Sequence, residues 1–182
     1  MSMPDCAPHF NARRWKSPNL AISSIAGNIE GHNVYVADLI LRRDRVSETV
    51  KELITEYQPD VVGLTAMSFQ FATARRIASL IKNLNKDIKI VLGGYHATLM
   101  YDEICKSEES EPFDFLVRGE GDICFTELLE AINGKRAIES VLGISFRNGG
   151  CFIHNSPRPL EDLSKIKIPD RSKRIWKGYQ YY

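Results

Sequence analysis

The sequence predicts an α/β fold, a doubly wound, Rossmann-like domain in which helices cover both faces of a parallel sheet. Two observations lead to this fold class. Short apolar runs with strand character alternate with stretches that carry apolar residues at helical spacing, which is typical of parallel strands joined by helical crossovers. The length of 182 residues, 43% of them hydrophobic and 26% charged, suits one globular domain with a tail.

The N-terminal elements are the least regular. Leu20–Ile29 carries apolar residues at helical spacing, and Pro18 suits the start of a helix. A short β-rich run follows at 33–37. A doubly wound sheet needs a strand before the first helix, and only Met1–Met3 stands there before a proline. We therefore expect a first strand that is short or lacks its beginning.

The middle of the chain alternates clearly. A helix is predicted from Ser47 to about Tyr57, and the apolar run 60–65 is typical of a strand buried on both faces. A helix at 72–83 and a strand at 88–92 come next, and Gly93-Gly94 stops that strand. These elements define the centre of the sheet.

The last part of the α/β unit repeats the pattern. A short helix is expected around 99–105, a strand at 113–117 and a helix at 122–132, which Asn133-Gly134 closes. We assign residues 1–134 to this domain.

A different pattern follows residue 134. Two β-rich runs, 142–147 and 151–154, flank Asn148-Gly149-Gly150, so residues 135–156 are predicted to form a β-hairpin extension. Residues 157–182 are rich in proline and then in basic and aromatic residues. Such a run could stack single-stranded bases, but a linker that packs on something outside the chain is the favoured reading.

Charge and composition exclude several classes. With 24 basic against 23 acidic residues, the formal net charge of +1 argues against a nucleic-acid partner. No apolar run reaches the roughly 18 to 20 residues of a membrane span. Met1–Pro8 lacks the order of a secretory signal, so we expect a cytoplasmic protein.

The four cysteines do not suggest a metal site. Cys6, Cys105, Cys124 and Cys151 are too far apart in sequence for the ligand spacings of zinc or iron–sulfur sites. Four cysteines could form two disulfides, but a chain of this length supports a core without them. We expect reduced, structural thiols.

Ligands of open parallel sheets bind beyond the carboxyl ends of the strands, where three loops here have unusual composition. Gly93-Gly94 could bring backbone close to a ligand or could form a tight turn, and the sequence leaves both open. Hydroxyls in Thr65–Ser68 could bind a ligand or cap a helix. Arg118–Asp122 places two glycines around a carboxylate at a helix start, where carboxylates also suit the helix dipole.

No motif for a self-sufficient catalyst is present. The sequence contains neither G-x-G-x-x-G nor G-x-x-x-x-G-K-[ST], which weakens dinucleotide and nucleoside-triphosphate readings. His96 has no second ligand at metal-binding spacing, so a hydrogen-bonded loop residue is favoured over a metal ligand.

Taken in order, these segments resemble the N-terminal cobalamin-binding domain of cobalamin-dependent radical SAM enzymes. The resemblance covers nearly the whole chain. It rests on the following segments: Ser17–Ala21, Gly31–Val34, Pro59–Thr65, Gly93–Thr98, Gly119–Asp122 and Pro157–Leu163. The resemblance implies a flavodoxin-like cobalamin-binding fold.

The wider family carries D-x-H-x-x-G, then S-x-L, then G-G. Thr65-Ala66-Met67 would stand for S-x-L, and Gly93-Gly94 follows at close to the family's interval. The D-x-H-x-x-G element, whose histidine ligates cobalt from below, is absent, as is common in the radical SAM branch. His9 is a remote candidate for a non-standard cobalt ligand, and no other metal ligand is predicted.

The resemblance implies that the nucleotide tail of cobalamin enters the sheet edge between the Thr65 and Gly93 loops, with the corrin above. Phe10, Trp15 and Phe71 are further plausible corrin contacts. Gly94→Val should block the slot without loss of stability if Gly94 has ordinary backbone angles. The predicted cofactor-binding residues are Thr65, Ala66, Met67, Ser68, Phe69, Gly93, Gly94, Tyr95, His96, Thr98, Gly119, Glu120 and Gly121.

The resemblance also implies a partner domain. The three-cysteine motif that holds a [4Fe-4S] cluster is missing, so the cluster and S-adenosylmethionine would belong to a radical SAM barrel outside this chain. The parent would be a methyltransferase, or a cyclase or oxidoreductase, and this domain alone would bind cobalamin without catalysing. Two alternatives remain: a docking module of the same fold without cobalamin, and a flavodoxin-like electron carrier.

Overall fold

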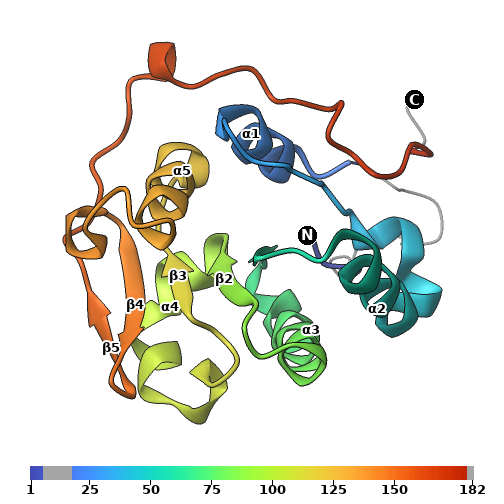
Figure 1. The fold of residues 1–182 in the computed structure, drawn as a ribbon, viewed down its shortest axis with the longest axis horizontal. Coiled ribbons are helices and arrows are strands. Elements are labelled where there is room, and N and C mark those ends of the chain that lie inside the picture. The colour runs from blue at the N-terminus through green and yellow to red at the C-terminus, as the bar shows by residue number, and fades with distance from the viewer. Residues whose placement is uncertain (6–17, 180–182) are drawn as a thin grey trace.

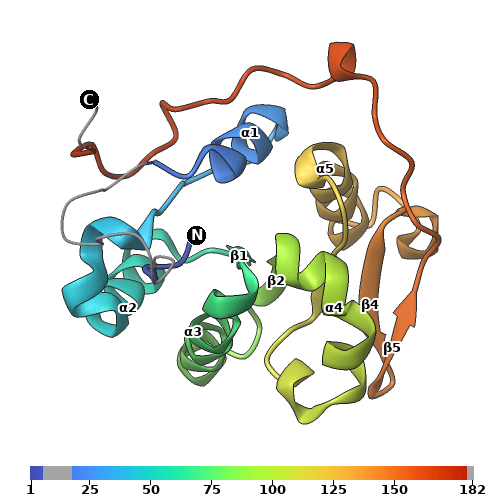
Figure 2. The same ribbon diagram turned by 180° about the vertical axis from the view of Figure 1, so that it is seen from behind.

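The computed structural model describes residues 1–5 and 18–179, which form one five-stranded sheet with helices on both faces (Figures 1 and 2). In sheet order the strands are β1 (Val61–Thr65), β2 (Lys89–Gly93), β3 (Phe115–Val117), β4 (Ile144–Asn148) and β5 (Cys151–His154). β1, β2 and β3 run parallel, whereas β4 pairs antiparallel with β3 and with β5. The predicted hairpin therefore extends the parallel sheet along its β3 edge.

At the other edge the sheet continues through single bridges. Ser2 bridges Thr65 on one side and Asp38 on the other, both in the parallel sense. The order is thus 33–38, then 1–3, then β1, β2 and β3, which is the flavodoxin-like order. The expected strand at 33–37 takes part only in an isolated bridge, between Val36 and Arg174.

The helices divide between the two faces. α1 (Leu20–Asn28) and α5 (Gly121–Ile132) lie over one face, and α2 (Val46–Tyr57), α3 (Phe71–Leu84) and α4 (Tyr95–Lys106) lie over the other (Figures 1 and 2). α4 begins four residues before the expected Leu99. The segment Tyr95–Thr98 is therefore its first turn and not a loop.

The two faces are packed differently. Side chains of α2, α3 and α4 form the main core with the sheet, for example Val50, Ile77 and Ile104 against Leu64 and Leu92. A smaller core lies under α5 and is built from Val91, Val117, Cys124, Leu128, Val141, Ile144 and Phe146. Of α1 only Ser23 and Ala26 are buried. α1 therefore covers the sheet without being packed tightly onto it.

Residues 157–179, which we call the strap, run back over α5 and α1 (Figures 1 and 2). The strap begins at Arg158, which pairs with Glu127 of α5, and ends beside Val36, whose backbone exchanges hydrogen bonds with Lys173 and Ile175. The sequence indicated a linker that packs on something outside the chain. In the structure residues 157–179 lie on their own domain, with Leu160, Leu163 and Ile168 exposed to solvent.

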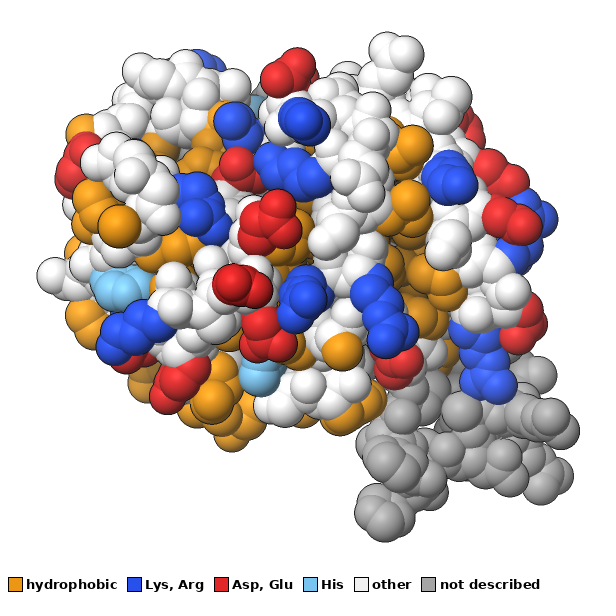
Figure 3. All heavy atoms as spheres, turned by 90° about the horizontal axis from the view of Figure 1, so that it is seen from below, with side chains coloured by type: hydrophobic (Ala, Val, Ile, Leu, Met, Phe, Trp, Pro, Cys, Tyr) orange, Lys and Arg blue, Asp and Glu red, His pale blue; other side chains and the backbone are white. Residues whose placement is uncertain are grey.

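The surface carries charges of both signs. On the face shown in Figure 3, lysine and arginine side chains are interspersed with aspartate and glutamate. Among the residues described, no helix is long and apolar enough to cross a membrane.

Candidate functional site

A cavity of about 710 Å³ separates the sheet from α1 and α5. It extends from the carboxyl ends of β1, β2 and β3 to the start of β1, and residues 31–37 and the end of α2 close its side. Cavities of this size hold small organic ligands. The cavity lies on the face where α1 covers the sheet without packing tightly onto it.

The floor of the cavity follows from strand alternation. In β1, Val62 and Leu64 point into the main core, so Val61, Gly63 and Thr65 face the cavity. Because glycine has no side chain, the floor is deepened at Gly63 and, on β2, at Gly93. A β-carbon at Gly93 would have no neighbour closer than 3.9 Å, so this part of the floor is open.

The mouth is formed by the turn between β3 and α5. Gly119, Glu120 and Gly121 line it, and Gly119 has a φ of 77° with open space where a side chain would stand. At Gly121 a β-carbon would lie 3.0 Å from Ile25 of α1. This glycine therefore lets α1 approach the start of α5.

Gly94 has a different role from Gly93. Its φ is 90°, and a β-carbon there would lie 2.6 Å from Oγ1 of Thr65 and 2.9 Å from the backbone of Ala66. The condition for a harmless Gly94→Val substitution, ordinary backbone angles, is therefore not met. Gly94 is required because the loops after β1 and β2 pack against each other.

Hydroxyl and backbone groups tie the same loops together. Thr98 Oγ1 donates to the Gly94 carbonyl at 3.0 Å and accepts from the Gly119 N–H at 2.9 Å. The Ala66 N–H donates to Gly93, and its carbonyl accepts from His96. Thr98 was expected to bind a ligand, but its hydroxyl is occupied by this network.

His96 joins the ends of β1 and β2. Its Nδ1 lies 3.2 Å from Oγ of Ser68, and its ring packs on Phe71 with centroids 4.4 Å apart. Partial burial lowers the pKa of His96, and the carboxylate of Glu109 opposes that shift. The imidazole is therefore kept neutral near pH 7.

Six of the thirteen predicted site residues line the cavity: Thr65, Gly93, Gly94, Gly119, Glu120 and Gly121. The other seven lie at the same sheet edge but outside the lining. They are Ala66, Met67, Ser68, Phe69, Tyr95, His96 and Thr98. Met67, Phe69 and Tyr95 follow the carboxyl ends of β1 and β2 and are 46%, 47% and 60% exposed; we call these three residues the apolar rim.

α1 forms the roof of the cavity. Ile22 and Ile25 of α1, and Ile29 directly after it, line the cavity from above. Asp122, in the first turn of α5, accepts hydrogen bonds from Oγ of Ser24 and Nδ2 of Asn28 and so joins the two helices. From the sequence these isoleucines stood out only as apolar residues at helical spacing.

Two further lining residues were missed. Gly63 lies in the middle of β1, and a β-carbon there would meet the ring of Phe125 from α5 at 3.2 Å. The signal was a glycine inside a buried strand, two residues before Thr65. Nothing in the sequence indicated that Phe125 would lie over it.

The cavity lining carries acidic charge. Asp60, Glu120 and Asp122 line it, and no lysine or arginine is among the described lining residues. This lining suits the neutral parts of a ligand and leaves an anionic group to backbone N–H donors at the mouth.

Some predicted residues lie outside the described part of the chain, namely His9, Phe10 and Trp15. Within residues 1–5 and 18–179 no three His, Cys, Asp or Glu residues are grouped to hold a metal. Cys105, Cys124 and Cys151 are free thiols there, and burial raises the pKa of Cys124 to about 11.

Comparison with known proteins gives a consistent result. The model of the B12 binding domain family matches residues 13–129. The chain is 32% identical to an uncharacterized methyltransferase of Pyrococcus horikoshii over 84% of this chain and 33% of that protein. It is 34% identical to the anaerobic magnesium-protoporphyrin IX monomethyl ester cyclase of Rubrivivax gelatinosus, over 78% of this chain and 26% of the cyclase. The chain thus spans about a third or less of these relatives.

Solved structures show the same fold. The radical S-adenosylmethionine methyltransferase TsrM of Kitasatospora setae, with cobalamin and a [4Fe-4S] cluster bound, superposes with a TM-score of 0.70 at 21% identity. The match covers 94% of this chain and 31% of TsrM. The cobalamin-dependent enzyme OxsB, with aqua-cobalamin and S-adenosylmethionine bound, gives a TM-score of 0.63 over 84% of this chain and 21% of OxsB.

Proposed function

From the premise that this chain belongs to the B12-binding domain family, we propose that the cavity under α1 and α5 holds the nucleotide tail of cobalamin. The observation that carries the proposal is the cavity itself, about 710 Å³ between the sheet and two helices, with a glycine-lined mouth at the carboxyl ends of the strands. A narrow tail needs such depth, whereas a flat ring needs only a rim.

The residues present fit this group. Gly63 and Gly93 remove side chains from the floor, and the floor residues beside them, Val61 and Val91, are small and apolar. The isoleucines of α1 supply an apolar roof. The acidic lining favours the ribose and base over the phosphate, which we place at the mouth, near the backbone of residues 119–121.

The corrin ring is assigned to the apolar rim. Met67, Phe69 and Tyr95 are exposed on the edge where the mouth opens. A broad amphipathic ring covers such side chains without entering the cavity. These residues orient the cofactor and shield one side of it from water.

Cobalamin supplies the carbon–cobalt chemistry, and this chain binds and presents it. The curated relatives are about three times as long as this chain. We infer that the parent protein is a radical SAM methyltransferase or cyclase, whose barrel domain carries a [4Fe-4S] cluster and S-adenosylmethionine. The methyltransferases and the cyclase among the relatives and structural neighbours support this inference.

The test is retention of cobalamin by the purified chain. After incubation with hydroxocobalamin and desalting, the wild-type protein should keep a corrin absorption band. Gly93→Val should weaken retention by about ten-fold or more, because its methyl groups would fill the mouth. Its nearest neighbours leave room for a β-carbon, so the fold should persist.

Gly93→Ala and cobinamide are the matched controls. Alanine should have a smaller effect than valine, and cobinamide, which lacks the nucleotide tail, should bind both variants like the wild type. No retention by the folded wild-type protein would rule out the proposed function. Equal loss of cobalamin and cobinamide in Gly93→Val would rule out the placement of the tail.

A further inference from the structure

The cavity roof is held in place from two sides. Toward α5, Ser24 and Asn28 donate to Asp122, and Thr126 Oγ1 donates to the Asn28 carbonyl. On its outer side α1 contacts the strap. Because the space beneath α1 is a cavity, these lateral contacts and not a packed core fix the position of the helix.

The strap contacts α1 through its backbone. The N–H of Asp170 donates to the Ser23 carbonyl at 2.9 Å, and the N–H of Lys167 donates to Oδ1 of Asn28 at 2.9 Å. The guanidinium of Arg174 is buried and donates to Oγ of Ser23 at 3.1 Å. Strap and helix are thus joined along the whole length of α1.

Gly27 explains the closeness of this contact. A β-carbon at Gly27 would overlap the carbonyl oxygen of Ile168, and it would lie 3.1 Å from the nitrogen of Asp170. Glycine weakens a helix interior, so its presence here is accounted for by the strap backbone lying directly on α1.

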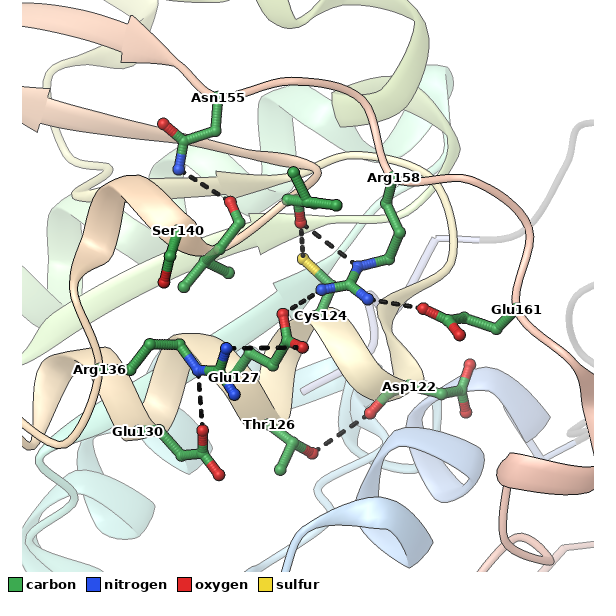
Figure 4. Close-up of polar contacts among 12 residues, drawn as sticks. Asp122, Cys124, Thr126, Glu127, Glu130, Arg136, Ser140, Asn155, Arg158 and Glu161 are labelled. Atoms are coloured by element: carbon green, nitrogen blue, oxygen red, sulfur yellow. Dashed lines mark hydrogen bonds and ion pairs between the residues drawn. The ribbon is translucent and has the colours of Figure 1, made fainter.

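The strap is anchored by side chains at both ends, and between them it contacts α1 mainly through its backbone. Arg158 is bound by Glu127 and Glu161 (Figure 4), and Tyr179 donates to Asp38 at the far end. Between these anchors Leu160, Leu163 and Ile168 are 86%, 78% and 87% exposed. A segment that buries so little apolar surface opens more readily than the core.

We propose that the strap is a latch on the cavity roof, and that its release from α1 governs how fast a ligand enters and leaves the cavity. The latch depends on the proposed function in one respect only: the ligand of the cavity is a corrinoid. The docked strap holds α1 over the cavity, and a released strap leaves α1 held only from the side of α5. The strap thereby sets the rate at which the roof opens, for entry and for exit alike.

The test uses Gly27→Ala, which lies outside the cavity lining and adds only a methyl group beneath the strap. Two readouts are needed. Trypsin cleavage at Lys165, Lys167 and Arg171 measures strap release in the absence of any ligand. The binding and dissociation rates of cyanocobalamin measure how readily the roof opens. In Gly27→Ala the cleavage rate and both cyanocobalamin rates should be about ten-fold higher than in the wild type. The variant should still show a cooperative melting transition, because the core is unchanged.

Glu30→Ala is the matched control, because it removes only the exposed ion pair with Lys167. Its cleavage and exchange rates should stay within about two-fold of the wild type. A second variant, Ser23→Ala, removes the buried hydrogen bond from Arg174 without adding atoms beneath the strap, and Ser23 does not line the cavity. It should raise cleavage and both exchange rates in the same direction, so it tests the latch even if Gly27→Ala fails to fold.

The outcomes separate the two proposals. Faster cleavage in Gly27→Ala with unchanged exchange rates would overturn the latch and leave cobalamin binding intact. Unchanged cleavage would overturn the strap–helix contact on which the latch depends. No binding by the folded wild type would overturn the proposed function, and the latch with it.

Discussion

At the scale of single residues, the adjacent glycines Gly93 and Gly94 do different work. Gly93 lies in the floor of the cavity, with room for a β-carbon, whereas Gly94 has a φ of 90° and touches the loop after β1. The motif G-G therefore combines one residue that leaves space for a ligand with one that shapes the backbone. The sequence G-G does not show which glycine has which role, because both roles select against a side chain.

The first prediction concerns how substitutions of these two glycines change the stability of the fold. Gly94→Ala should lower the free energy of unfolding by about 2–4 kcal/mol, because the side chain would adopt an unfavourable φ and overlap Thr65. Gly93→Ala should cost less than about 1 kcal/mol. Urea denaturation of both variants measures this difference, and equal losses would contradict the assigned roles.

Hydroxyl groups at the strand ends show the limit of residue-level prediction. Thr98 and Ser68 were expected to meet a ligand because hydroxyls bind phosphate and ribose. In the fold Thr98 bridges Gly94 and Gly119, and Ser68 lies against His96. These protein partners could not be read from the sequence, and the contact of either hydroxyl with a ligand stays a prediction.

At the scale of elements, the buried centre of the sheet was predictable and its edge was not. The strands β1, β2 and β3 stand out as apolar runs, and α3 and α5 as periodic stripes. The segment 33–37 has strand composition but takes part only in an isolated bridge, since pairing depends on a partner segment as well as on composition. α4 begins at Tyr95 without a capping side chain, so its start left no signal.

The strap is the second element whose structure composition alone did not reveal. Its prolines and charges are typical of a linker, yet Arg158 is largely enclosed, with 8% of its side chain exposed. Glu127 and Glu161 bind this guanidinium, and Glu127 comes from α5, 31 residues earlier (Figure 4). Such a pair cannot be read from spacing, because its partners meet only after folding.

The second prediction follows from that pair. Arg158→Met should lower the free energy of unfolding by about 2–3 kcal/mol, because it leaves the partly buried carboxylate of Glu161 without this cation and leaves Glu127 with only the longer contact to Arg136. Arg136→Met is the matched control: its pairs with Glu130 and Glu127 are more exposed, so it should cost less than about 1 kcal/mol. Urea unfolding curves of the two variants compare the costs directly.

At the scale of the whole molecule, two histidines make the folded state less stable as the pH falls. Burial lowers the pKa of His96, and burial together with Arg118 lowers the pKa of His154. Their unfolded pKa is about 6.5, so the unfolded chain takes up protons more readily as the pH falls through that value. Stability is therefore present above about pH 6.5 and is lost as the pH falls below it.

The third prediction is measured on the intact chain. The melting temperature should be lower at pH 5.5 than at pH 7.5, and the His96→Gln/His154→Gln variant should lose less across this interval. Differential scanning calorimetry at both pH values gives the comparison. An identical pH dependence in wild type and variant would assign the effect to other groups.

The join between the strap and the roof helix also sets the order in which the molecule is completed. Ser23 and Arg174 are 151 residues apart in sequence, yet they share a buried hydrogen bond. Contacts of such long sequence separation form late, because a large loop must be closed first. A ribosome makes α1 early, but the helix gains its outer partner only after the strap has emerged. Until then the roof of the cavity is held from one side alone, by Asp122 and Thr126 of α5.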